Sequence, residues 1–576
     1  MDQKRLLIAL VFSFAVLGIF TFIQDKFFPH PQQPQTVQTT HTAQTTAPGA
    51  APGAAAGAEV PPPGPRLAVN APLMTGSIGL TGAIFDDITL TSYHETIKPD
   101  SPLVQILGRR GGPTPTYAQF GWSAGPGIKV PADSTVWTPS AQTLTPSSPV
   151  TLSWDNGQGL IFQLLLSVDD KYMFTVRQNV INNTSAPVAL YPWSRVVRDY
   201  KPKEETSWVL FDGPLGVFNG TLKQESYKTL KSDGEHVPGG GAFKASGPGG
   251  WAGITDKYWL TAVAPEQSAA MHATMSYGTV KDGDGSAYQT SFITANPVTA
   301  APGGSAAFTS HLFTGAKVVK VLDGYQREYH IPNFYKAVDF GMLYVLTKPI
   351  FFALDYLNSL TGNFGLAILI FTVGIKLLFF PLASYSYRSM ARMKGVQPKI
   401  AALREQFKDD NVKLQQATME LYKTEKINPA SGCLPMLLQI PVFFSLYKVI
   451  FITIEMRQAP FYGWIHDLSA PDPTNIFNLF GLIPWDPMVI SPLLHVGALP
   501  LIMGFTMYLQ QKLNPAPADP AQARMFQFMP FIFTFMLARS PAGLVLYWAW
   551  NNLLSVGQQW LIMRQAAPKK TVPAKA

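Results

Sequence analysis

A single lysine interrupts a stretch of the sequence that is otherwise apolar. Residues 363–381 carry no charged residue except Lys376, and Pro381 follows it by five positions. A lysine at the centre of a membrane helix costs about 2.5–3.5 kcal/mol. At about 1.5 Å per residue, Lys376 lies about 7–8 Å from the end marked by Pro381. Its ammonium group therefore either snorkels to the membrane interface or lines a water-filled cavity on that side of the membrane.

Further polar residues occupy this and the other apolar stretches at comparable depths in the predicted membrane. Thr372 precedes Lys376 by one helical turn, and Gln439 lies beside Pro441. Each of these residues alone is more often a helix–helix contact than part of a site. Together they favour a shared hydrated cavity, to which the later stretches add Gln510, Gln511, Asn551, Asn552, Gln558 and Gln559.

The composition narrows the class of protein. Only 14% of the 576 residues are charged and 47% are hydrophobic, with a net charge of +8 and a mean hydropathy of +0.10. These values exclude a disordered acidic chain, a coiled coil and a collagen-like chain. The one cysteine, Cys433, excludes an intrachain disulfide and a cysteine-based metal cluster. No nucleotide-binding G-x-x-x-x-G-K-[ST] motif is present.

Six apolar segments predict six membrane spans. The first, Leu6–Ile23, follows Lys4 and Arg5 and lacks a small-residue cleavage site directly after it, so residues 1–26 are interpreted as an uncleaved anchor. The alternative is a long signal peptide cut near Ala54–Ala58. The other spans are predicted at 363–383, 431–454, 493–512 and, as a hairpin of two, 525–563.

The charges of the connecting segments predict the orientation. Residues 384–430 hold nine Lys and Arg residues, whereas residues 455–492 hold only Arg457 against four acids. Lysine and arginine accumulate on the cytoplasmic side of membrane proteins. Both termini are therefore predicted to be cytoplasmic, together with the loop 513–524 and the basic tail 564–576, and residues 455–492 form an external loop.

The long segment before the second span is predicted to be exported. Residues 27–65, rich in Pro, Gln, Thr and Ala, form a flexible linker. Short apolar runs separated by Gly, Pro and Asp turns predict an all-β sandwich over 66–325, in which Asp86-Asp87 and Asp169-Asp170 are turn or strand-edge acids. Residues 326–362 are predicted to form amphipathic helices in the outer membrane interface, or alternatively to extend the next span.

The basic segment 384–430 is predicted to be a cytoplasmic helical hairpin, with helices at Ser386–Phe407 and Val412–Lys426. Asp409-Asp410-Asn411 supplies the break and an N-cap. Its positive residues are interpreted as a surface that receives substrate or the ribosome, or else as a solvated face near anionic lipid. Those taken as the candidate contacts are Arg388, Arg392, Lys394, Lys399 and Arg404.

Several motifs resemble the YidC-type membrane protein insertases. Asn428–Tyr447 (NPASGCLPMLLQIPVFFSLY) resembles the third-span signature of that family, and Gln458–Phe461 with Trp464–Leu468 resembles the following loop. Phe528–Pro530 and Ser540–Tyr547 resemble the last two spans. The motifs cover residues 330–564, and the six-span layout with a large exported domain resembles the Gram-negative bacterial form.

The resemblance implies an α-helical polytopic membrane protein of the bacterial inner membrane. Five of its six transmembrane helices would form an insertase core around a hydrophilic groove, and the periplasmic domain would be an all-β super-sandwich. Such a protein inserts and folds membrane proteins, alone or with the Sec translocon, without a chemical reaction, a cofactor or a metal. The partners implied are nascent membrane proteins, Sec components, the lipid bilayer and the ribosome through the hairpin and tail, with no nucleic acid recognised by sequence.

The resemblance also assigns residues to the groove. The family's groove cation corresponds to Lys376; many members have Arg there, so the charge is retained while bidentate pairing is lost. Thr372 corresponds to a groove threonine, and Tyr547 and Trp548 correspond to two adjacent aromatic residues. Gln439 and Gln511 complete the predicted groove. Substrate helices are predicted to slide along the third and fifth spans, where adaptable methionines are available: Met436, Met525, Met529 and Met536.

Two functions of other classes remain as alternatives. A channel or secondary transporter would also use an intramembrane lysine, but the sequence shows no inverted repeat. A membrane-anchored carbohydrate enzyme would use the exported domain, but the sequence shows no pair of carboxylates suited to glycoside hydrolysis.

Overall fold

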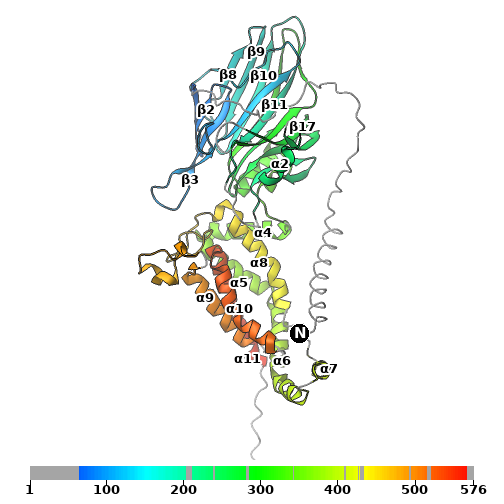
Figure 1. Ribbon diagram of the computed structural model, residues 1–576, viewed down its shortest axis with the longest axis vertical. Coiled ribbons are helices and arrows are strands. Elements are labelled where there is room, and N and C mark those ends of the chain that lie inside the picture. Colours follow the sequence, from blue (N-terminus) through cyan, green and yellow to red (C-terminus); the bar gives the residue numbers. More distant parts are fainter. Residues whose placement is uncertain are drawn as a thin grey trace, which may run out of the picture. The chain divides into compact units, whose positions relative to one another are not determined.

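In the computed structural model, the described residues fall into ten segments of the chain (Figure 1). The predicted anchor 1–26, almost all of the linker 27–65, Cys433 and most of the tail lie outside the described residues. The described ranges are 64–202, 210–237, 240–279, 285–341, 343–407, 410–425 with 427, 434–491, 494–514 and 520–566.

Two sheets form the sandwich in the first half of the chain. The larger sheet has eleven strands, in the order β14-β17-β18-β11-β5-β3-β2-β1-β7, with β19 paired to β11 and β4 paired to β3. The second has nine strands, in the order β13-β12-β15-β16-β20-β10-β9-β8-β6. Nearly all neighbours are antiparallel; the exception in the described part is the short parallel pair β1–β7.

The larger sheet consists of β1 (Arg66–Asn70), β2 (Met74–Gly79), β3 (Ile84–His94), β4 (Leu103–Leu107), β5 (Thr116–Ala124), β7 (Thr143–Leu144), β11 (Val188–Arg198), β14 (Gly241–Pro248), β17 (Ala270–Thr279), β18 (Ser286–Thr294) and β19 (Val298–Ala300). The second consists of β6 (Thr138–Pro139), β8 (Val150–Asp155), β9 (Leu160–Val168), β10 (Met173–Asn182), β12 (Gly213–Phe218), β13 (Thr221–Gln224), β15 (Trp251–Thr255), β16 (Trp259–Pro265) and β20 (Ser305–Ala316).

The β8–β9 hairpin illustrates why these residues form strands. Along β9 buried side chains alternate with more exposed ones, which is the period of a strand with one face in the core. The turn contains Gly157, whose φ of 71° favours glycine. Asp155 Oδ1 accepts a hydrogen bond from the Gly157 backbone N–H at 2.8 Å. These residues thus form a β-hairpin, as the alternating apolar pattern and the turn residues favour.

Aromatic side chains join the two sheets into one core. Phe85 on β3 meets Phe174 on β10 edge to face at 5.4 Å. Trp122 on β5 meets Phe162 on β9 in the same way at 5.1 Å. Because each pair takes one ring from each sheet, the sandwich has a continuous apolar interior.

Acidic residues in the sandwich have structural partners. Asp87 accepts a hydrogen bond from Arg109 at 2.7 Å, and its neighbour Asp86 pairs with Arg66. Asp169 accepts hydrogen bonds from the backbone N–H groups of Lys171 and Met173, as a turn residue does. Asp169 is thus a turn acid as predicted, whereas Asp86 and Asp87 lie within β3, which has β2 and β5 as neighbours, and are held there by arginine partners.

Helices dominate the rest of the described chain. The sandwich carries α2 (Tyr227–Gly234) beside β17 and is followed by α3 (Val319–Glu328) and the short 3-10 helix η1 (Phe334–Ala337). The later helices are α4 (Tyr344–Thr361), α5 (Phe364–Leu378), α6 (Phe380–Gln406), α7 (Asn411–Thr424), α8 (Leu434–Ile452), α9 (Ala498–Leu513), α10 (Pro520–Leu537) and α11 (Ala542–Ala566). Between α8 and α9 lie three short 3-10 helices, η3 (Ile454–Met456), η4 (Ile476–Gly481) and η5 (Pro487–Val489).

Helix α11 packs against α9, α5, α6 and α8, and α10 packs against α9 (Figure 1). Within the described residues, no single helix is both long enough and apolar enough to cross a membrane. Helices α5 and α6 together have the required length and apolar composition, and they are bent by 68° relative to each other.

The bend between α5 and α6 falls beside the predicted span end. Helix α5 ends at Leu378 and α6 begins at Phe380, with Pro381 in its first turn, where a residue without an N–H group is tolerated. The structure therefore begins the first helix of the predicted hairpin at Phe380 rather than Ser386, because the proline starts a helix here instead of only ending one.

Helices α6 and α7 form an antiparallel pair. Asp410 caps α7 by accepting hydrogen bonds from the backbone N–H groups of Val412 and Lys413. Val396 and Ile400 on α6 pack against Ile427, and Lys399 pairs with Glu425. At its other end α6 is held by Tyr387 and Met390, which pack on Ile562 of α11.

Candidate functional site

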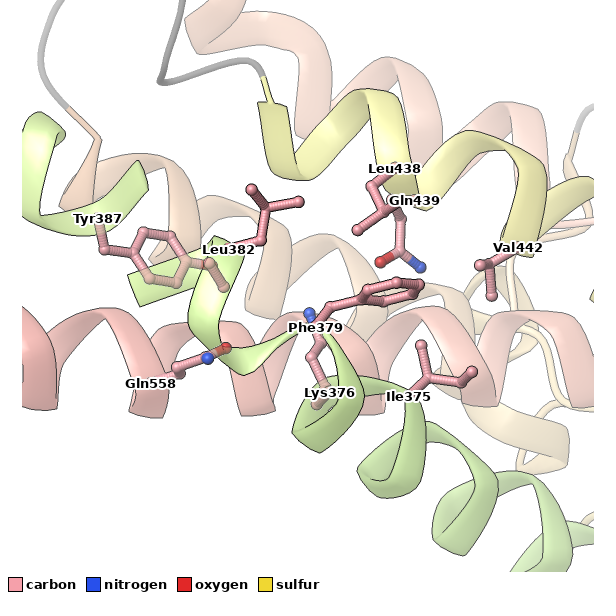
Figure 2. Close-up of a pocket in the computed structure, with 10 residues that line it drawn as sticks. Ile375, Lys376, Phe379, Leu382, Tyr387, Leu438, Gln439, Val442 and Gln558 are labelled. Atoms are coloured by element: carbon pink, nitrogen blue, oxygen red, sulfur yellow. The ribbon is translucent and has the colours of Figure 1, made fainter. Parts of the chain in front are cut away.

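A cavity lies where four helices converge around the bend between α5 and α6 (Figure 2). Its volume of about 30 Å³ has room for at least one water molecule. The lining combines apolar side chains with an ammonium group, two amides and a phenol. The lining residues are Ile375, Lys376, Phe379, Leu382, Ala383, Tyr387, Leu438, Gln439, Val442 and Gln558.

Lys376 enters this cavity from the last turn of α5. Its Nζ donates a hydrogen bond to Ser555 Oγ of α11 at 2.7 Å. The serine hydroxyl in turn donates to the Asn551 carbonyl at 2.8 Å and is buried. No carboxylate stands among the described residues that line the cavity. The ammonium group is thus oriented by a neutral hydroxyl, which leaves its charge available to an anionic group that enters.

Gln439 reaches the same cavity from α8. Its Nε2 donates a hydrogen bond to the hydroxyl of Tyr547, a buried residue of α11. Tyr547 therefore acts behind the cavity wall and orients the amide that faces the cavity. Its neighbour Trp548 packs against Phe443 of α8, with ring centres 4.7 Å apart, and against Phe533 of α10 at 5.6 Å.

Two further predicted groove residues, Thr372 and Gln511, are also absent from the cavity lining. Thr372 is buried, does not line the cavity, and donates its hydroxyl hydrogen bond to the Ile368 carbonyl of its own helix at 2.7 Å. Gln511 donates to the Phe526 carbonyl and so joins α9 to α10. Both residues satisfy their polar groups within the helix bundle, as polar residues between membrane helices commonly do.

Two residues of the cavity lining, Tyr387 and Gln558, and the hydrogen-bond partner of Lys376, Ser555, carry more weight in the structure than in the sequence. Ser555 and Tyr387 gave no signal, because a serine and a tyrosine in helical sequences are common and their partners are distant in the chain. Gln558 was noted only as one of several polar residues. It lines the cavity, and its Nε2 is buried without a hydrogen-bond partner among the described residues.

The predicted substrate-contact methionines lie mainly on α10. Met525 and Met536 are exposed, at 56% and 58%, and Met529 is partly buried. Met436 belongs to α8, but its side chain lies outside the described part. The exposed apolar surface of α10 extends over Phe528, Phe531, Ile532 and Phe535.

The predicted hairpin cations all lie on α6. Arg388, Arg392 and Lys394 are exposed, whereas Lys399 has Glu425 as its partner and Arg404 is partly buried. Four of these cations are therefore exposed on α6, one of them, Lys399, with an acidic partner, and Arg404 is partly covered.

Two family models match this chain. The model of the 60Kd inner membrane protein matches residues 356–570, and the model of the YidC periplasmic domain matches residues 66–353. A curated relative from Granulibacter bethesdensis, named membrane protein insertase YidC, is 56% identical over 98% of each chain. A relative of the same name from Acidiphilium cryptum is 56% identical over 88% of this chain and 86% of its own.

The chain belongs to the YidC family of membrane protein insertases. Its architecture is that of the family, a β-sandwich periplasmic domain joined to a helical insertase core, and the protein is an inner membrane protein. A crystal structure described as an active YidC insertase with its first transmembrane domain resolved covers 88% of this chain and 94% of its own, with 16% identity and a TM-score of 0.35. The channel or transporter alternative finds no support in these relatives.

Proposed function

We propose that this chain inserts nascent membrane proteins through the cavity around Lys376. The observation that carries the proposal is the junction of α5, α6, α8 and α11, where Lys376, Gln439 and Gln558 face one space. Among the described residues, the Lys376 ammonium group donates to the Ser555 hydroxyl and has no carboxylate in the cavity lining, so it provides an attraction for acidic exported segments.

The physical effect of such a cavity is to lower the cost of moving polar groups into the membrane. A hydrophilic segment loses its hydration in the hydrocarbon core, where each unsatisfied backbone group costs several kcal/mol. Water, amides and one ammonium group replace part of that hydration. The apolar helix of the substrate then leaves along α8 and α10 into lipid, driven by the burial of its own surface. No bond is made or broken, so no enzymatic step is part of the proposal.

The proposed topology follows from the charges. The basic residues of 384–430 and of the tail 564–576 lie on the cytoplasmic side with both termini, and the sandwich lies in the periplasm. Nascent chains, the Sec translocon and, through the hairpin and tail, the ribosome are the proposed partners. The exposed Arg388, Arg392 and Lys394 supply the cationic surface for this contact.

Photocrosslinking tests the path. A photoreactive amino acid at Leu438, in the cavity, and at Met529 or Met536, on α10, is expected to crosslink to a stalled nascent membrane protein. The matched control position is Ile502 on α9, which is 46% exposed but does not line the cavity. Crosslinks that are equally strong from Ile502, or absent from Leu438, would contradict the proposed path.

A further inference from the structure

The connection between α8 and α9 exposes an unusual amount of apolar surface. We call residues 475–496 the apolar loop. It contains η4 and η5, and is drawn in yellow-orange before α9 in Figure 1. Ten of its large apolar side chains are between 37% and 84% exposed: Ile476, Phe477, Leu479, Phe480, Leu482, Ile483, Trp485, Met488, Val489 and Ile490. Soluble surfaces rarely expose so many contiguous apolar side chains without a partner.

The apolar loop is closed at its base. The Ile476 backbone N–H donates to the Val496 carbonyl at 2.9 Å, and Asn475 Nδ2 donates to the Leu494 carbonyl at 2.8 Å. These two hydrogen bonds bring together the two ends of the apolar loop.

Inside the loop, many backbone groups are satisfied internally. Phe480 N–H donates to the Asn475 carbonyl and Ile483 N–H to the Asn478 carbonyl, while Asp486 Oδ1 accepts from Met488 N–H at 2.9 Å. A segment whose backbone is bonded internally loses little on leaving water. Its side chains can therefore enter an apolar medium while its fold is retained.

The base of the loop is fixed to the start of α9. Asp472 Oδ2 accepts a hydrogen bond from Leu499 N–H at 2.7 Å, and Thr474 Oγ1 accepts one from Ala498 N–H at 2.9 Å. The loop thus projects from the end of a helix whose own surface exposes Ile502 and Phe505, at 46% and 61%. The exposed apolar surface of this helix is continued at its N-terminal end by the loop.

The chemistry of the loop favours lipid over a protein partner. Between Arg457 and Lys512 the sequence has no Lys or Arg, and Asp486 is the only acid within residues 475–496. Protein interfaces surround an apolar centre with a polar rim, which a loop with one acid does not provide. Leu482, Val489 and Ile490 are more than 70% exposed, so they project outward instead of lining a groove. Trp485 is a residue type that membrane interfaces favour.

We propose that the apolar loop inserts its side chains into the acyl-chain region of the outer membrane leaflet and fixes the periplasmic end of the α8–α9 connection to the bilayer. The proposal rests on the proposed topology, in which residues 455–492 lie on the periplasmic side.

Site-specific fluorescence in proteoliposomes tests the proposal. In a Cys433→Ser background, the environment-sensitive dye NBD is attached at Leu482→Cys or Val489→Cys of the full chain. Lipids carrying a nitroxide high on the acyl chain serve as quenchers. Val136→Cys is the matched water-exposed control, because Val136 is an apolar residue of the sandwich that is 56% exposed. Phe531→Cys on α10, which is 60% exposed, reports whether the helical core lies in the bilayer.

The expected result is blue-shifted emission and loss of intensity with nitroxide lipid at positions 482 and 489, but not at 136. Quenching at 531 with water-like emission at 482 and 489 would overturn the loop proposal and leave the topology intact. Blue-shifted emission that nitroxide lipid does not quench would overturn it in favour of a protein partner or a second copy of this chain. Absence of quenching at 531 would overturn the proposed membrane arrangement, and the loop proposal with it.

Discussion

Removal of the charge at Lys376 should distinguish substrates by the charge of their exported segments. The variant Lys376→Ala deletes the ammonium group that faces the cavity and donates to Ser555. An acidic exported segment then loses its attraction to the cavity, whereas a neutral one loses nothing electrostatic. The expected defect is therefore selective for the acidic substrate.

The size of the insertion defect follows from the distance between the two charges and from the polarity of their surroundings. An ammonium and a carboxylate about 5 Å apart attract by about 3 kcal/mol at an effective dielectric constant of about 20. The carboxylate also loses hydration when it enters, and we take about half of the attraction as the remaining net gain. A difference of about 1.4 kcal/mol is about tenfold in an equilibrium or a rate. Insertion of an acidic-tail substrate by Lys376→Ala should thus fall by about tenfold.

The assay compares two substrates that differ only in their tails, one with aspartates and one with asparagines at the same positions. Protection of the tail from protease measures insertion, either in cells depleted of the wild-type protein or in proteoliposomes. Lys376→Arg should retain insertion of both substrates because it retains the charge. Ser555→Ala removes the hydrogen-bond partner but not the charge, so it should retain the preference for the acidic tail.

The reasoning is refuted if Lys376→Ala slows both substrates equally. That result would assign Lys376 a structural role in the junction of α5, α6, α8 and α11. A selective loss in Ser555→Ala as large as in Lys376→Ala would show instead that the position of the ammonium group, and not only its charge, decides insertion.

Three further predictions concern the stability of the protein. Burial lowers the pKa of His311 to about 4. The unfolded state therefore binds more protons than the folded state between pH 6.5 and 4, and the free energy of unfolding falls with acidification, by about 2 kcal/mol at pH 5. The variant His311→Gln should reduce the decrease in Tm of the purified protein from pH 7 to pH 5, and a decrease as large as in the wild type would contradict this cause. Arg198 pairs with Asp256 through two hydrogen bonds of 2.7 and 2.8 Å, and the arginine side chain is only 4% exposed. Asp256→Ala should therefore destabilise the sandwich by about 3 kcal/mol in denaturant unfolding, whereas Asp410→Ala, which removes a solvent-exposed helix cap, should have a smaller effect. A Cβ atom at Gly504 of α9 would lie 2.0 Å from Thr534 Oγ1 of α10, while one at Gly557 would meet nothing within 4 Å. The variant Gly504→Val should therefore lower the free energy of unfolding by about 1–3 kcal/mol by separating the two helices, whereas Gly557→Ala should not. Equal Tm values for the two variants would show that the α9–α10 contact adjusts freely.

Much of the fold was predictable because its signals are local. The hairpin from Val150 to Val168 follows from alternating apolar residues around a turn that contains Gly157, and the sandwich over residues 66–325 repeats this pattern. Asp410 signalled the start of α7 by a capping chemistry that needs only neighbouring residues. The family motifs in Asn428–Tyr447 and Ser540–Tyr547 pointed to the family that the comparisons show.

The candidate site was predictable only in part. Lys376 and Gln439 were expected to share a cavity and both line it, but Thr372, expected beside them, faces its own helix backbone. Spacing along the chain places Thr372 and Lys376 on one side of α5. The bend after Leu378 and the packing of α11 then decide which part of that side is covered.

The sequence by itself determined where polar and charged residues interrupt apolar segments, because composition and period are properties of the chain alone. It therefore determined the class of protein, the exported all-β domain, the basic hairpin and the singular charge of Lys376. Only the tertiary structure decided which residues meet. Ser555 lies 179 positions from Lys376 and is its hydrogen-bond partner, and no local pattern relates the two. Helix α8 is apolar on nearly every side, so its sequence does not reveal which face looks toward the cavity; that choice follows from the packing of its neighbours, which turns Gln439 toward Tyr547 and the space beside Lys376.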